Sequence, residues 1–394
     1  MTTQTEIRSE AAAEKTGSEH ETKLNNGSDV PPDDVLKEKP PFTYGDIKRK
    51  IPAHCFERST TTFLFYTLSN VGSCLLLFYL ATWIDHLNLP NYARNTLWIS
   101  FWIAEGLFMS GLWVICHECV HYAGSDIKIV NDIIGVALHS VLLTPFHSWR
   151  ESHLRHHRHT GNYENDENWV PLNRKLAEKY WPGVYEETNV FSFIRLIILV
   201  TAGWYAYLIT NIGGPREKYP GKNVNHYSFG SVFCPKNAFL LVISNSGVIA
   251  WSSLLVYMAY THSFKSVFVY YFMPLLVCTA FFMLITLLQH TDTYVPHIHE
   301  ESWSWLWGSL CTVDRSYGKV LDAISHHLGD THICHHLFPR MPFYHAVEAT
   351  KAIKEAAGPY YVEDKTPILK ALWRIASNCK FLDENDLIAY WKRS

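Results

Sequence analysis

Three short clusters of histidine carry the clearest chemical signal in the sequence. The first is His117-Glu118-Cys119-Val120-His121, whose histidines four residues apart share one face of a helix, as in helical metal sites. The second is His153-Leu154-Arg155-His156-His157, and the third is His332-Ile333-Cys334-His335-His336. On a helix, the first histidine of the His-x-x-His-His pattern shares a face with at least one of the pair, and the other points toward a second metal. We interpret the clusters as a metal centre rather than as three unrelated groups of solvated histidines.

The number and type of these donors limit the metals that they would bind. Imidazole nitrogen suits iron, zinc and copper. Zinc usually has four ligands, so the eight histidines of the clusters are too many for one ion and enough for two ions with open positions for oxygen. Non-haem iron with open positions activates O₂, in the oxygenases with a mixed set of histidine and carboxylate ligands. The spacing alone does not distinguish iron from zinc.

Two other residue types lie within the first cluster. Cys116 and Cys119 form a Cys-x-x-Cys pair, but no second such pair exists to complete a zinc site. We therefore predict that both are small buried residues that pack beside the ligands. Glu118 has two open interpretations, as a partner that orients an imidazole or as a solvated charge.

The histidine clusters lie beside apolar stretches that are long enough to span a membrane. Each has about 20 residues or more and at most one charge, and a helix of that length crosses a hydrocarbon core of about 30 Å. Aromatic residues crowd their ends, as at membrane interfaces. Such a set is unusual for the core of a water-soluble protein, so we predict an integral membrane protein. The five stretches are residues 61–83, 97–116, 190–212, 239–260 and 267–288.

A sixth apolar stretch, residues 133–146, has 14 residues, which is too short to span and suits a re-entrant or interfacial segment. Between His157 and His332 lie three long stretches. The second and third clusters therefore meet on one side of the membrane only if one of these stretches lies along it. We choose residues 190–212, which include the charged Arg195.

Composition excludes several classes of protein. The 394 residues include 34 basic and 37 acidic side chains, a net charge of −3 that argues against a nucleic-acid binder. Nine cysteines in so long a chain do not indicate a secreted disulfide scaffold. Residues 1–40 are polar, lack the basic and apolar regions of a secretory signal peptide, and are predicted to be a disordered cytosolic tail before one membrane domain, 41–394.

Segments around the clusters resemble the membrane-bound fatty acid desaturase family, and within it the methyl-end (Δ12 and ω3) desaturases. The similarity extends over roughly residues 40–375, nearly the whole chain except the polar tail. The segments that carry it precede the first span, lie before the second and third clusters, and follow the third cluster: residues 40–47, 51–59, 148–150, 314–318, 330–339 and 341–350.

This resemblance implies an all-α fold of four transmembrane helices plus interfacial helices, with a cytosolic, histidine-rich cap that holds two iron ions. It also implies a ninth ligand, His290, in Leu288-Gln289-His290 just after the last span. From the residues alone, His290 is as well explained by a solvated interfacial histidine. The implied ligands are His117, His121, His153, His156, His157, His290, His332, His335 and His336.

The resemblance further implies an enzyme that introduces a cis double bond into the acyl chain of an acyl-lipid or acyl-CoA, with O₂ as cosubstrate. Glu118, in place of Asp, favours Δ12 desaturation of oleate to linoleate over ω3 desaturation. The chain has no His-Pro-Gly-Gly haem motif, and the third cluster begins with His332 rather than Gln, both unlike front-end desaturases. Cytochrome b5 and its NADH-dependent reductase are the implied electron donors. Acid-rich residues 1–30 are unlike a plastid transit peptide, which favours the endoplasmic reticulum membrane, with both termini and the clusters cytosolic.

Two departures and several alternatives remain. Val120 and Tyr122 stand where many relatives have Gly and His, which we expect to reshape the substrate channel and to leave the metal set intact. The same scaffold also serves ω3 desaturases, hydroxylases, acetylenases, epoxygenases and conjugases. A metal transporter would hold its ligands inside the spans, whereas these clusters border the spans. A structural or receptor protein leaves the clusters unexplained.

Overall fold

The computed structural model describes residues 36–180, 182–183, 188–382 and 386–392. Most of the predicted tail, residues 1–35, lies outside the described residues. At its described end, the side chain of Leu36 is buried, and its carbonyl accepts a hydrogen bond from Trp307 Nε1 at 3.2 Å. The packed part of the chain thus begins a few residues before position 41.

Each of the five predicted apolar stretches forms a helix, and all five are long and apolar enough to cross a membrane. The last two of the long helices are joined through a short helix, α10 (Phe264–Val267), and a π-helical turn, η4 (Phe268–Phe272). A short 3₁₀ turn, η2 (Ile84–His86), follows the first. The long helices are α3 (Thr60–Ala81), α4 (Asn91–Val120), α8 (Asn189–Thr210), α9 (Ala238–Thr261) and α11 (Met273–His290).

Polar side chains set the ends of these helices. The Ser59 hydroxyl accepts a hydrogen bond from the Thr62 N–H at 3.2 Å and caps α3. Thr188 caps α8 in the same way. Asn211 ends α8 in the left-handed conformation, with φ of 55°, which asparagine adopts more readily than most residues. The limits of the apolar stretches therefore coincide with local stop signals.

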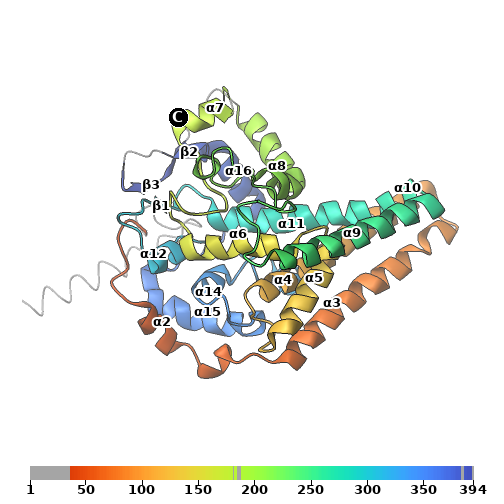
Figure 1. Cartoon of the computed structure of the whole chain (residues 1–394), viewed down its shortest axis with the longest axis horizontal. Helices are drawn as coiled ribbons and strands as arrows, with labels where there is room; N and C mark the ends of the chain where they lie inside the picture. The colour runs from red at the N-terminus through yellow and green to blue at the C-terminus, as the bar shows by residue number, and fades with distance from the viewer. Residues whose placement is uncertain (1–35, 181, 184–187, 383–385, 393–394) are drawn as a thin grey trace, which may run out of the picture.

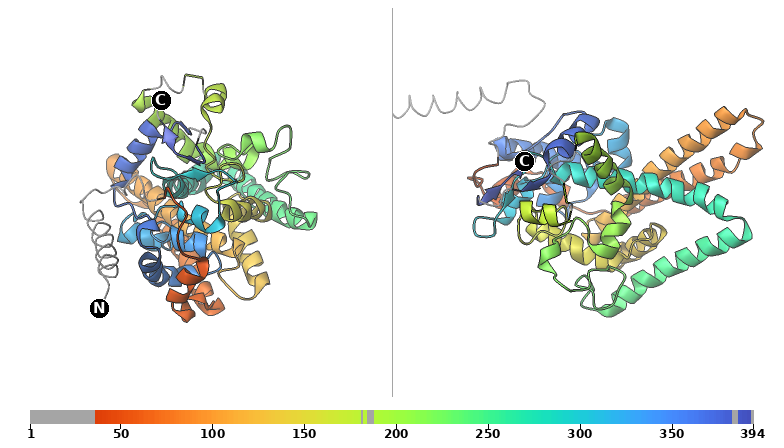
Figure 2. Two further views of the ribbon diagram at one scale, coloured as in Figure 1. Left: turned by 90° about the vertical axis from the view of Figure 1, so that its left-hand side faces the viewer. Right: turned by 90° about the horizontal axis from the view of Figure 1, so that it is seen from above.

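Four of the long helices extend away from the rest of the molecule (Figure 1). Figure 2 shows them as two hairpins, α3 with α4 and α9 with α11, that separate with distance from the cap. By contrast, α8 lies beside the cap, where it packs on α11 and α16 (Ile368–Asn378), and it is steeply inclined to the other four (Figure 1). The helix chosen from the sequence as the one lying along the membrane is thus the one with the different orientation.

The short sixth stretch forms part of a bent pair of helices. The pair consists of α5 (Lys128–Val141) and α6 (Phe146–His159), whose axes meet at 106°. Pro145 lacks the N–H that would continue α5 and stands directly before α6. At the corner, a Cβ on Gly135 would lie 2.3 Å from the Phe146 ring, so only glycine allows this close approach. The geometry agrees with a re-entrant segment.

Short helices form the cap that carries the third cluster. The cap elements are α2 (Tyr44–Lys50), η1 (Ala53–Phe56), α7 (Arg174–Tyr180), η3 (Arg216–Lys218), α12 (Trp305–Leu310), α13 (Lys319–Ile324), α14 (His332–Leu337), α15 (Phe343–Ala357), η5 (Gly358–Tyr360) and α16. Apolar side chains of α2, α12, α14 and α15, such as Ile47, Leu310, Ile333 and Ile353, are fully buried in a core of their own.

The fold is mostly helical, and the predicted all-α class is corrected only by short strands that pair the C-terminal residues with earlier segments. β1 (His297–Ile298) pairs antiparallel with β3 (Ile388–Ala389), and β2 (Phe381–Leu382) pairs antiparallel with β4 (Trp391–Lys392). Each strand has two residues, which is too short for period-two alternation to be visible in the sequence.

Candidate metal centre

All nine predicted histidines come together where the long helices meet the cap, and all nine are buried. The C-terminal ends of α4 and α11 carry His117 and His121, and His290. The last two turns of α6 carry the second cluster, and α14 consists almost entirely of the third. Segments nearly 220 residues apart in the sequence therefore supply one site, from 117 to 336.

Five of the histidines form a first group, in which one ring nitrogen from each lies within 4.8 Å of the others. Their Nε2 atoms form a chain of close contacts, with 3.0 Å from His153 to His121, 3.1 Å from His157 to His153, and 3.0 Å from His335 to His157. His117 completes the group.

The other four form a second group beside the first. One ring nitrogen from each of His156, His290 and His336 lies within 4.8 Å of the others. His332 joins them, because its Nε2 lies 2.9 Å from His290 Nε2 and 3.0 Å from His336 Nε2. The nine histidines thus divide into sets of five and four.

Hydrogen bonds among imidazoles do not account for all of these contacts, whereas ligation of two metal ions would. A ring nitrogen carries one proton or one lone pair and makes one hydrogen bond. Yet Nε2 of His153, His157 and His332 each lies about 3 Å from two other Nε2 atoms. Two nitrogens bound at about 2.1 Å to one ion and about 90° apart lie about 3.0 Å from each other. The donor sets therefore fit one ion each.

The surroundings keep these imidazoles in the neutral form that binds metals. Burial, followed by the neighbouring imidazoles, holds the pKa of the histidines outside the spans well below its usual range. A neutral imidazole offers a lone pair, and no proton has to leave before a metal binds. The histidines concerned are His121, His153, His157, His332, His335 and His336.

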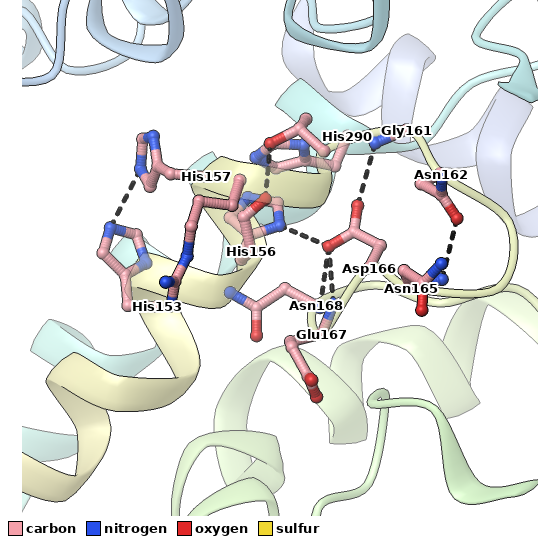
Figure 3. A network of polar contacts seen from close by, with 12 residues as sticks. His153, His156, His157, Gly161, Asn162, Asn165, Asp166, Glu167, Asn168 and His290 are labelled. Atoms are coloured by element: carbon pink, nitrogen blue, oxygen red, sulfur yellow. Dashed lines mark hydrogen bonds and ion pairs between the residues drawn. The ribbon is translucent and has the colours of Figure 1, made fainter. Parts of the chain in front are cut away.

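A carboxylate in the loop after α6 orients His156 (Figure 3). Asp166 Oδ1 accepts a hydrogen bond from His156 Nδ1 at 2.6 Å and from the N–H groups of Glu167 and Asn168 at 2.7 and 3.2 Å. Asp166 Oδ2 accepts from the Gly161 N–H at 2.9 Å. Because Nδ1 donates to the carboxylate, Nε2 of His156 presents its lone pair to the second group.

A hydroxyl connects the second and third clusters. Thr160 Oγ1 donates to the carbonyl of His156 at 2.8 Å and lies 3.1 Å from His336 Nδ1, from which it accepts. Sequence reasoning missed both Asp166 and Thr160. The loop from 160 to 168 offers three acidic residues, and nothing in their spacing distinguishes Asp166 from its neighbours.

The two predictions for the first cluster have different outcomes. Cys116 and Cys119 are free and fully buried, as predicted. Glu118 is only 3% exposed, so the interpretation as a solvated charge is wrong. The Glu118 carboxylate accepts a hydrogen bond from the Phe343 N–H at 3.2 Å and so links α4 to the start of α15.

A buried ionic cluster holds the end of α11, and thereby His290, against the cap. The fully buried Arg315 donates to Asp292 at 2.5 Å and to Asp364 at 2.7 Å, and also to the carbonyl of Leu288. Arg374 of α16 contacts the same two carboxylates at 2.6 Å. Two cations balance two anions, which compensates for their removal from water. Sequence reasoning placed Arg315 in a family-like segment without giving it a role.

An apolar cavity opens onto both histidine groups. Its walls include Trp113 of α4, Leu199 and Trp204 of α8, and Phe282 and Met283 of α11. Trp113 stacks on Phe282 with ring centroids 4.3 Å apart. The histidines that reach the cavity are His117, His153, His156, His290, His332 and His336. A cavity lined by aromatic and aliphatic groups suits an apolar ligand, with the donor nitrogens at one wall.

Comparison with known proteins identifies the family. The family model described as "Fatty acid desaturase" matches residues 96–366, which include all nine histidines. The chain belongs to the fatty acid desaturase family.

Individual desaturases are similar over nearly their whole length. The chain is 40% identical over 354 residues to "Delta(12)-fatty-acid desaturase FAD2" of Vernicia fordii, covering 89% of this chain and 90% of the relative. It is 40% identical over 368 residues to "Omega-6 fatty acid desaturase, endoplasmic reticulum isozyme 2" of Glycine max, covering 90% and 94%. It is 39% identical over 351 residues to "Acyl-lipid (9+3)-(E)-desaturase" of Dimorphotheca sinuata, covering 89% and 90%.

Proposed function

We propose that this desaturase is a Δ12 enzyme that converts an oleoyl chain to a linoleoyl chain with a cis double bond. The reaction takes two hydrogens from adjacent methylenes and consumes O₂, two electrons and two protons to give two waters. The observation that carries the proposal is the apolar cavity bounded by two groups of buried histidines. The Δ12 activity named for the relative from Vernicia fordii supports the position of the new bond.

The nine histidines are the proposed ligands of two iron ions, five for one and four for the other. When bound, the irons supply the reduction of O₂ and the removal of hydrogen from unactivated C–H bonds, for which no side-chain base is strong enough. The set of four leaves more room for a further ligand than the set of five. Asp166 and Thr160 hold two of the imidazoles of this smaller set in their binding tautomer.

The protein itself positions the acyl chain and excludes water. Trp113, Trp204 and Phe282 form flat apolar walls that fit methylene groups, and they leave the histidine wall as the polar boundary of the cavity. The place where the chain meets that wall decides which bond is desaturated. Side chains that line the cavity, such as Met283, therefore bear on regiochemistry.

The arrangement supports four transmembrane helices, α3, α4, α9 and α11, with α8 at the membrane interface. The outer face of α8 is apolar, with Phe191, Ile194 and Ile198 between 47% and 63% exposed. Four crossings return both termini to the side that carries the cap, which we propose is the cytosol. The endoplasmic reticulum is the proposed membrane, in line with the name of the relative from Glycine max. We propose that one membrane domain follows the polar N-terminal tail, with its packed part beginning near Leu36 rather than at position 41.

Electrons come in this proposal from cytochrome b5 and its NADH-dependent reductase. The substrate is an acyl-lipid or an acyl-CoA, and the enzyme takes it from the membrane lipid phase. In this proposal the carrier reaches the protein at the cytosolic cap.

Expression in a yeast that makes oleate and palmitoleate but no dienes tests the function. Gas chromatography of total fatty acids is expected to show linoleate for the wild type and none for His335→Ala, with equal amounts of both proteins in membranes. Wild-type product from His335→Ala would overturn the metal-dependent mechanism. Product that forms only after linoleate feeding would identify an ω3 desaturase, and a trans, hydroxylated, epoxidised, acetylenic or conjugated product would identify the corresponding alternative.

A further inference from the structure

A second cluster of metal-binding side chains lies outside the nine histidines. It brings together His54 and Cys55 of η1 with His345 and Glu348 of α15. One potential ligand atom from each of the four lies within 4.8 Å of the others. The two halves are separated by nearly 300 residues of sequence, so the fold alone creates the cluster.

The contacts within this cluster are close and come from two directions. His54 Nε2 lies 3.0 Å from Glu348 Oε2 and 3.7 Å from Cys55 Sγ. The rings of His54 and His345 meet edge to face, with centroids 5.5 Å apart. His345 and Glu348 are three residues apart and share one face of α15, as helical metal ligands do. The Ser59 N–H donates a hydrogen bond to the Tyr344 hydroxyl at 2.7 Å, which adds a contact between the chain just after η1 and α15.

We propose that His54, Cys55, His345 and Glu348 bind one Zn²⁺ ion. Two imidazoles, one thiolate and one carboxylate are the ligand types that zinc takes in a tetrahedral site. The thiolate disfavours Mg²⁺ and Ca²⁺, which prefer oxygen ligands alone. With Cys55 and Glu348 each carrying one negative charge and both imidazoles neutral, Zn²⁺ gives a site with no net charge.

The burial of its members suits a metal rather than a surface ion pair alone. The side chains of His54 and Glu348 are about half exposed, at 52% and 50%, which leaves a path for the ion. The Cys55 side chain is fully buried and points its sulfur at His54. Burial, and then the charge of Glu348, raise the pKa of the Cys55 thiol, and a bound cation would reverse this effect. Zinc binding is therefore expected to release a proton and to weaken at low pH.

The ion would have a structural role. It would tie η1, which precedes the first long helix, to α15, whose first residue donates to Glu118 of α4. The N-terminal segment and the cap would then be joined beside the histidine-bearing end of α4. Zinc at this site is outside the reaction and is expected to contribute to stability.

Metal analysis of the full-length protein tests the proposal. The chain is purified in detergent without a polyhistidine tag, and zinc and iron per chain are measured by mass spectrometry. We expect one zinc in addition to iron. We expect Cys55→Ser and Glu348→Gln to lower zinc affinity at least about tenfold in chelator competition, with iron unchanged. Glu355→Gln, an exposed carboxylate on the same helix, is the matched control and is expected to bind zinc as the wild type does.

Cobalt substitution gives a readout that is independent of folding yield. Co²⁺ in the wild type is expected to show a thiolate charge-transfer band, which Cys55→Ser removes and Glu355→Gln keeps. A wild type with no metal besides iron and no such band would overturn the proposal and leave a hydrogen-bonded ion pair only. Zinc affinity unchanged in both Cys55→Ser and Glu348→Gln would also overturn it. Because Glu348 is half exposed, its variant tests the site even if Cys55→Ser does not fold.

Discussion

Asp166→Asn isolates the contribution of the carboxylate that orients His156. The substitution keeps the shape of the side chain and removes its charge and one acceptor oxygen. Three donors, His156 Nδ1 and the N–H groups of Glu167 and Asn168, contact one carboxylate oxygen of Asp166. We therefore expect the single oxygen of the asparagine side chain to face these three donors. The new amide nitrogen then faces the Gly161 N–H, which is 2.9 Å from the present Oδ2, so two donors oppose each other.

We expect Asp166→Asn to lower the metal affinity of the second group of histidines. Loss of a group that orients a metal-binding imidazole lowers affinity about 10- to 100-fold. At about 1.4 kcal/mol for each factor of ten, this corresponds to about 1.4–2.8 kcal/mol. One iron of the two should be affected, because His156 lies in the set of four.

Release of iron to a chelator measures this effect directly. We expect Asp166→Asn to lose one iron per chain faster and at lower chelator concentration than the wild type, with the second iron retained. Product formation should fall in proportion to the iron lost. Glu301→Gln, an exposed carboxylate of the cap, is the control and should behave as the wild type. Wild-type iron affinity in Asp166→Asn would refute the orienting role.

Three further substitutions, one of them with a matched control, test other parts of the structure. Arg315→Met removes one of the two cations that balance the buried carboxylates of Asp292 and Asp364 and should destabilise the protein by about 3–5 kcal/mol, seen as a lower midpoint in thermal size-exclusion assays. Gly106→Ala places a Cβ 2.5 Å from a side chain of α11 and should cost about 1–3 kcal/mol, whereas Gly72→Ala meets nothing within 4 Å and should not destabilise. Thr286→Trp fills the apolar cavity and should lower product from oleate about tenfold or more with iron content unchanged; unchanged product would remove the cavity from the substrate path.

The sequence predicted what local patterns encode. The five long helices follow from uninterrupted apolar stretches, and the bent pair follows from a stretch too short to span. His117 and His121 share a helix face because they are four residues apart. These features depend on neighbours in the sequence, and the structure contains all of them.

Features that depend on distant residues were not predictable in this way. Asp166 orients His156 because the loop after α6 folds back on that helix, and the spacing of its acidic residues does not reveal this. The partners of Arg315 come from the end of α11 and from the segment before α16. Glu118 left two interpretations open because its burial depends on α15, which is more than 220 residues further along the chain. His290 was identified as part of the set through family resemblance rather than by its own spacing.

Iron per chain, measured together with product in one preparation, tests the central claim most directly. The wild type is expected to contain two irons and to form linoleate. His290→Ala removes one donor from the set of four, and we predict that it retains about one iron and forms no product. A His290→Ala protein with two firmly bound irons and wild-type product formation would contradict the account.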